Sequence, residues 1–172
     1  MSCMRLRSTA RRWVRSVLGR SDLDYAIAPE VHNDGFAELI AEIASRSDVR
    51  VAIDVGASSG GGTTEALFEG LRNHDSRALV ALEISAPRYE NLRDRYGNFP
   101  WVFALHESSV GLDSFPDAEE VSSFIRMNGG VSLYGTTESE VLRWLEQDRS
   151  YIGRLRLPCN GIVHGLELVG TD

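Results

Sequence analysis

The sequence predicts an α/β fold in which a mainly parallel sheet lies between two layers of helices. Three short apolar runs, 49–55, 78–84 and 101–105, have the length and composition of buried parallel strands. Segments with helical periodicity or capping residues separate these runs, and the links between them are short. A strand–helix–strand order of this kind gives parallel strands with right-handed crossovers and helices on both faces of the sheet.

Helices are expected from periodicity and from residues that can cap a first turn. Between Phe36 and Ile43, apolar residues recur at i, i+3, i+4 and i+7, and Asn33 or Asp34 can cap that helix. Ser85 can cap another, in which proline occupies the first turn. The expected helices over the first part of the chain are 33–46, 63–73 and 85–96.

The later part of the chain has a looser pattern. A helix is expected over 117–127, with Val121 and Phe124 facing inward. Thr137 and Glu140 have the spacing of a capping box, which predicts a helix running to about residue 154.

The segment 162–169 could form a fourth strand, although Gly165 weakens a strand there. The chain shows no internal repeat, so 21–172 is expected to form one domain behind an N-terminal segment, 1–20.

The most informative motif follows the first strand. Asp54 ends that strand, and a glycine-rich turn leads from it into the next helix. Glycine has no Cβ, so its backbone can turn tightly and approach a ligand closely, while the first turn of the helix offers free N–H groups. This arrangement is typical of nucleotide-like ligands bound at the carboxyl edge of a sheet. The candidate ligand-binding residues here are Asp54, Gly56, Ala57, Ser58, Ser59 and Gly60.

A second candidate position lies at the end of the second strand. A carboxylate there, Glu83, can accept hydrogen bonds from both hydroxyls of a ribose. The neighbouring Ile84 could lie against an adenine ring or could be a buried residue of the strand end.

Together these motifs resemble class I S-adenosylmethionine-dependent methyltransferases. The run 54–60 matches that family's Asp/Glu-x-Gly-x-Gly/Ser-x-Gly motif, and Glu83 matches the acid that ends its second strand. The resemblance covers about residues 49–110 and implies a Rossmann-like fold with S-adenosylmethionine as cofactor. It also implies that Asp54 helps to place the methionine ammonium group, and that Glu107 or Ser108 touches the adenine amino group. The resemblance does not identify the catalytic residues or the methyl acceptor. We expect the acceptor to be a small molecule or a sugar.

Two other functions are considered. The run 56–62 also resembles the GASSGxG loop of short-chain dehydrogenases, which would imply NAD(P)-dependent oxidoreduction. That chemistry needs a Tyr-x-x-x-Lys pair, and the chain contains no lysine. The third possibility is a non-catalytic remnant that keeps the fold without turnover.

Charge is unevenly distributed. Residues 1–20 hold six arginines and no acid, whereas the rest of the chain carries 12 arginines and all 25 acidic residues. Residues 21–172 are acidic enough to repel a phosphate backbone, so we expect no nucleic-acid partner. The basic segment has an apolar helical face, which would suit weak contact with an anionic membrane surface or a targeting role, or it could be a solvated leader.

Two isolated cysteines, Cys3 and Cys159, indicate a reducing cytoplasm, and the scattered histidines predict no metal site.

The sheet is expected to be incomplete. Class I methyltransferases have seven strands, and the sequence provides three clear ones, so a truncated or frameshifted product is one interpretation. The first strand would then expose an open apolar edge, which predicts association between copies of the chain.

Overall fold

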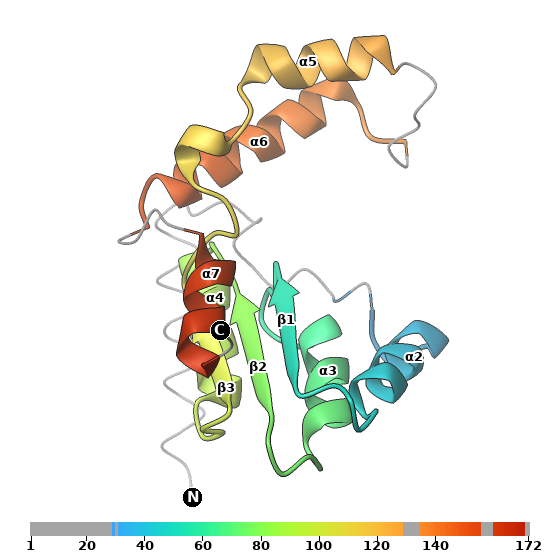
Figure 1. The fold of residues 1–172 in the computed structure, drawn as a ribbon. Coiled ribbons are helices and arrows are strands. Elements are labelled where there is room, and N and C mark those ends of the chain that lie inside the picture. The colour runs from blue at the N-terminus through green and yellow to red at the C-terminus, as the bar shows by residue number, and fades with distance from the viewer. Residues whose placement is uncertain (1–28, 30, 129–134, 156–159, 171–172) are drawn as a thin grey trace, which may run out of the picture.

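The structure, a computed structural model, describes residue 29 and residues 31–128, 135–155 and 160–170. The basic segment 1–20 and both cysteines lie outside the described residues. The described part is an α/β fold with a Rossmann-like, incomplete sheet (Figure 1). In chain order its elements are α2 (Gly35–Ala44), β1 (Val51–Val55), α3 (Thr63–Leu71), β2 (Ala78–Leu82), α4 (Ala86–Tyr96), β3 (Val102–Leu105), the 3-10 turn η2 (Leu112–Ser114), α5 (Ala118–Met127), α6 (Glu138–Ile152) and α7 (Gly161–Val169).

The described sheet has three parallel strands in the order β1-β2-β3. β2 is buried along its whole length, as its continuous apolar sequence predicts. Val55 pairs with Leu82, and Leu82 pairs with Leu105, so the carboxyl ends of the three strands lie together at one edge. The parallel α/β prediction is confirmed.

One face of the sheet is covered by α3 and α4. Side chains alternate along a strand, so Leu79 and Ala81 of β2 point to the same side. Leu79 packs with Leu71 of α3, and Ala81 packs with Leu92 and Tyr96 of α4. These contacts form the core that supports the carboxyl edge.

The opposite face is covered by α7, which corrects the expectation of a strand over 162–169 (Figure 1). Asn160 caps this helix by accepting hydrogen bonds from the N–H groups of Ile162 and Val163. Gly165 faces β2, where a Cβ atom would lie 2.5 Å from Val80 Cγ1. Gly165 therefore allows a helix to approach the sheet closely, and helices cover both faces as predicted.

The helix α2 packs on α3. At Gly70 of α3, a Cβ atom would lie 2.4 Å from the Ala41 carbonyl oxygen, so the two backbones are in close contact. The apolar residues Phe36, Leu39 and Ile43 of α2 are exposed. The helix was predicted correctly, but most of its apolar stripe faces outward.

α5 and α6 form a helical hairpin that Figure 1 shows beyond the carboxyl ends of the strands. The predicted capping box of Thr137 and Glu140 begins α6, and Asp117 and Glu120 form another at α5. Phe124 was predicted to face inward but is 57% exposed. Within the described ranges, no helix is both long and apolar enough to cross a membrane.

Candidate functional site

Residues 56–62, called the glycine bend below, connect β1 to α3. Three residues in it have left-handed backbone conformations: Gly56 (φ 80°), Ser58 (φ 52°) and Gly60 (φ 79°). Glycine adopts this region freely, whereas for serine it costs about 1–2 kcal/mol. Such strain is found mostly where the surrounding structure holds a functional loop in place.

The bend is attached to the end of β2. The N–H groups of Gly56 and Ala57 both donate to the Leu82 carbonyl oxygen, at 3.0 and 2.9 Å. The Gly60 N–H closes the turn on the Ala57 carbonyl oxygen at 2.9 Å. The shape of the bend therefore depends on the pairing of β1 with β2.

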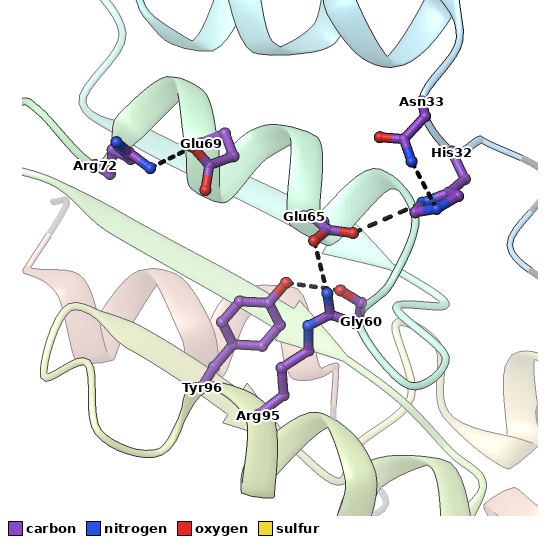
Figure 2. Close-up of polar contacts among 8 residues, drawn as sticks. All are labelled: His32, Asn33, Gly60, Glu65, Glu69, Arg72, Arg95 and Tyr96. Carbon is purple, nitrogen blue, oxygen red and sulfur yellow. Dashed lines mark hydrogen bonds and ion pairs between the residues drawn. The ribbon is translucent and has the colours of Figure 1, made fainter.

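Tyr96 holds the far side of the bend (Figure 2). Its buried hydroxyl donates to the Gly60 carbonyl oxygen at 2.6 Å. A Cβ atom at Gly60 would lie 2.6 Å from the Tyr96 ring and 2.8 Å from Leu92, so only glycine fits there. Burial raises the pKa of Tyr96 to about 12, which keeps the phenol protonated as a donor.

Glu65 connects three elements beside the bend (Figure 2). Its Oε1 atom lies 2.6 Å from Arg95 Nη2 of α4, and its Oε2 atom lies 3.8 Å from His32 Nδ1, ahead of α2. An ion pair as exposed as the one with Arg95 contributes about 0–1 kcal/mol. These contacts orient α3 against its neighbours more than they stabilise the fold.

A cavity of about 290 Å³ lies at the bend. This volume is near the lower end of the range for ligand pockets, about 300–1,000 Å³. Its walls come from β1, the bend, the start of α3, the segment before α2 and the first turn of α4. The lining residues are Pro29, Val31, Asp54, Gly56, Ala57, Ser58, Ser59, Gly61, Gly62, Thr63 and Arg88.

Asp54 provides a carboxylate in the cavity wall. It is 7% exposed, and Thr64 Oγ1 donates to its Oδ2 atom at 2.5 Å. Burial raises the pKa of Asp54, and the hydrogen bond from Thr64 opposes that rise. A cation in the cavity would favour the ionised carboxylate.

Glu83 follows β2 directly and lies beside the bend. It is buried, and its Oε1 atom accepts a hydrogen bond from the Ser85 N–H at 2.7 Å. Burial raises the pKa of Glu83, while the N–H groups of Ser85 and Ser58 and the charge of Arg88 lower it. Because the Ser58 N–H lowers this pKa, the Glu83 carboxylate lies close to the bend. Glu83 does not, however, line the cavity.

The predicted adenine contacts lie on the side of α7. Glu107 Oε1 lies 2.8 Å from His164 Nδ1, and the Ser108 carbonyl oxygen accepts from the Gly161 N–H at 2.7 Å. The Ile84 carbonyl oxygen is 3.0 Å from His106 Nε2. Ile84, Glu107 and Ser108 do not line the cavity, and the last two hold α7 against the sheet.

Sequence reasoning missed Arg88, Thr64 and Tyr96 as parts of this site. Glu83 and the glycines were candidates because their spacing after two strands is characteristic. Arg88 had a detectable signal, since it lies in the first turn of a helix that starts at the same sheet edge. Thr64 and Tyr96 had no such signal. Nothing in the sequence distinguishes Thr64 from the adjacent Thr63, and Tyr96 reaches the bend only through the packing of α4.

The cavity can therefore hold a small ligand between glycine backbone, a buried carboxylate and a guanidinium group. Such a site can bind and orient a polar, charged molecule at the carboxyl edge of the sheet. No protein-family model matches the chain, and comparisons with curated proteins and with solved structures give no match either.

Proposed function

We propose that this chain binds S-adenosylmethionine and transfers its methyl group to a small-molecule or sugar acceptor, or is the cofactor-binding part of such an enzyme. The observation that carries the proposal is the glycine bend, with the Asp54 carboxylate in the wall of its cavity and Glu83 beside it. The bend leaves room for a ligand, because a Cβ atom at Gly56 would meet no atom within 4 Å.

The charges of the site fit the cofactor. S-adenosylmethionine carries a sulfonium and an ammonium group, and the buried Asp54 carboxylate would hold the ammonium. Glu83 would accept hydrogen bonds from the ribose hydroxyls, as strand-end acids do in related folds. When bound, the cofactor supplies an electrophilic methyl group for an in-line displacement. The protein's part is to orient the donor and exclude water, and this supplies much of the rate.

The test is isothermal titration of the full chain with S-adenosylmethionine, its demethylated product and NAD. We expect binding of the first two with Kd on the order of micromolar, about −8 kcal/mol. Asp54→Ala should weaken it about tenfold or more, because an ammonium loses its charged partner. Asp48→Ala is the matched control, since Asp48 is exposed and pairs only locally with Arg46.

Two results would overturn the proposal. Binding of NAD with no response to S-adenosylmethionine would indicate a nicotinamide-dependent oxidoreductase. A folded chain that gives no heat with either cofactor would indicate a non-catalytic remnant.

A further inference from the structure

One side of α2 is apolar and is exposed in the part of the chain that the structure describes. Phe36, Leu39 and Ile43 recur at helical spacing and are 59%, 47% and 49% exposed. The helix is attached to α3 through another side, where Ala41 and Ala44 lie against α3. Large apolar side chains gathered on one side of a helix are typical of a contact surface. We call Phe36, Leu39 and Ile43 the outer face of α2.

The charges around the outer face are negative. Glu38 and Glu42 belong to α2, which contains no basic residue, and Asp34 caps its start. Arg46 follows the helix but pairs with Asp48 at 2.9 Å, so it does not offset the glutamates. The outer face therefore suits a partner that combines an apolar side with positive charge.

The chain itself contains a segment with these two properties. Residues 1–20 hold six arginines and no acid. Between Leu6 and Leu18, apolar residues recur at helical spacing, and they include Trp13. As a helix, 6–18 would be about 18 Å long, which is enough to cover the roughly 10 Å from Phe36 to Ile43.

The connection between this segment and α2 is long enough for the two to meet. An extended chain covers about 3.3 Å per residue, so residues 19–34 can span up to about 50 Å. A connection of this kind holds its two ends at an effective concentration on the order of millimolar. Even a weak contact would then be populated within one chain.

We infer that residues 6–18 pack as an amphipathic helix on the outer face of α2, with their arginines beside Glu38 and Glu42. The inference is independent of the proposed function, because no residue of the outer face lines the cavity at the glycine bend.

Other pairings fit the charges less well. A second copy of α2 would set glutamates against glutamates, and an anionic membrane surface would be repelled by the same carboxylates. The helix α5 also exposes apolar side chains, Phe124 and Met127. It carries an arginine of its own, however, and Arg126 already pairs with Glu119.

Paramagnetic relaxation in the full chain tests the inference. A nitroxide spin label is attached to Cys3, after Cys159→Ser has removed the other cysteine of the chain. Because Cys3 lies three residues before Leu6, we expect the oxidised label to remove at least half of the amide signal intensity of α2 relative to the reduced label. The signals of α7, on the opposite face of the sheet from α3, should be affected less (Figure 1). Mixing spin-labelled chain with unlabelled, ¹⁵N-enriched chain separates contact within one chain from contact between copies.

Variants of the outer face give the test its specificity. Leu39→Ser removes apolar surface and Glu42→Arg reverses a charge, so each should reduce the signal loss at α2 at least twofold. Val163→Ser on α7 and Glu146→Arg on α6 are the matched controls at exposed positions and should leave the signal loss unchanged. If circular dichroism shows that Leu39→Ser does not fold, Ile43→Ser takes its place.

Several results would overturn the inference. An undiminished signal loss in both Leu39→Ser and Glu42→Arg would exclude the outer face as the docking site. Signal loss at α5 instead of α2 would assign the segment to the helical hairpin, and loss that appears only in the mixed sample would indicate a second copy. No signal loss at α2, with binding of the chain to vesicles of phosphatidylserine and phosphatidylcholine, would assign the segment to a membrane surface.

Discussion

Gly56 and Gly60 share one backbone conformation in very different surroundings. Both have φ near +80°, but a Cβ atom at Gly60 would enter the Tyr96 ring, whereas at Gly56 it would point into open space. The two residues therefore separate the cost of the left-handed backbone from the cost of overpacking.

Alanine at each position measures these two costs. Gly56→Ala should lower the free energy of unfolding by about 1–2 kcal/mol, the backbone cost alone. Gly60→Ala should lower it by about 1–3 kcal/mol more, because the methyl group displaces Tyr96 and Leu92. Urea unfolding of both variants checks this, and equal losses would contradict the packing at Gly60.

Asp54 should make the stability of the fold depend on pH in an unusual direction. Burial raises the pKa of Asp54 above its ordinary value in the unfolded chain. Its contribution is therefore fully present below the ordinary carboxyl pKa and is lost as the pH rises through the raised pKa. Asp54→Asn, which cannot ionise, should gain free energy of unfolding relative to the unchanged chain between about pH 4 and pH 7.

Asp48 offers a control of opposite sign. The side-chain hydrogen bond from Arg46 lowers the pKa of Asp48, so its contribution is present at neutral pH and lost as the pH falls. Asp48→Asn should therefore lose stability relative to the unchanged chain as the pH rises toward the ordinary carboxyl pKa, below about pH 4, and the difference should stay level from about pH 4 to pH 7. Urea titrations at several pH values distinguish the two, and parallel trends would rule out the assignment for Asp54.

At the scale of elements, the sequence predicted structure wherever a local pattern had one solution. The apolar runs of the three strands and the Thr137 capping box led to elements within a few residues of the observed ones. The segment 162–169 was ambiguous, because a short apolar run suits a strand or a buried helix. The residues that flank it favour a helix: Asn160 caps its start, and Gly170 ends it in a left-handed conformation.

Gly165 explains how α7 lies so close to the sheet, and it provides a test. Gly165→Ala should gain about 1 kcal/mol of helix propensity but lose more, because the methyl group would meet Val80. A net loss of about 1–2 kcal/mol is expected in urea unfolding. Val80→Ala opens the same space, so the double variant should be more stable than the two separate losses imply. Simple additivity would contradict the contact between α7 and β2.

The candidate site was only partly predictable from sequence. Strand ends mark where polar residues of a parallel sheet gather, and this located Asp54, the glycines and Glu83. Glu107 or Ser108 was expected at the adenine from the family resemblance, but α7 lies against both residues in the structure. Which polar side chains face a cavity depends on helices packed from elsewhere in the chain, and no local pattern reports that.

For the molecule as a whole, the edge of the described sheet along β1 bears on association between copies of the chain. β1 is an edge strand of the described sheet, and its Val55 is 53% exposed. Exposed sheet edges recruit strands from other copies, and charged side chains are a common protection.

We therefore expect the chain to associate through this edge. Light scattering at high concentration should give a mass above that of the monomer, and Val55→Lys should reduce it. Leu168→Lys, on the exposed side of α7, is the control and should leave the mass unchanged. A monomer at high concentration for the unchanged chain would contradict the prediction.

The Leu82 carbonyl oxygen accepts two N–H groups of the glycine bend, and this links the pocket to the folding of the sheet. The pocket cannot keep its shape unless both strands are paired, so any opening that separates β1 from β2 also abolishes it. Amide hydrogens of Gly56 and Ala57 should then exchange with solvent at the rate of the β2 core, far more slowly than those of an ordinary surface loop.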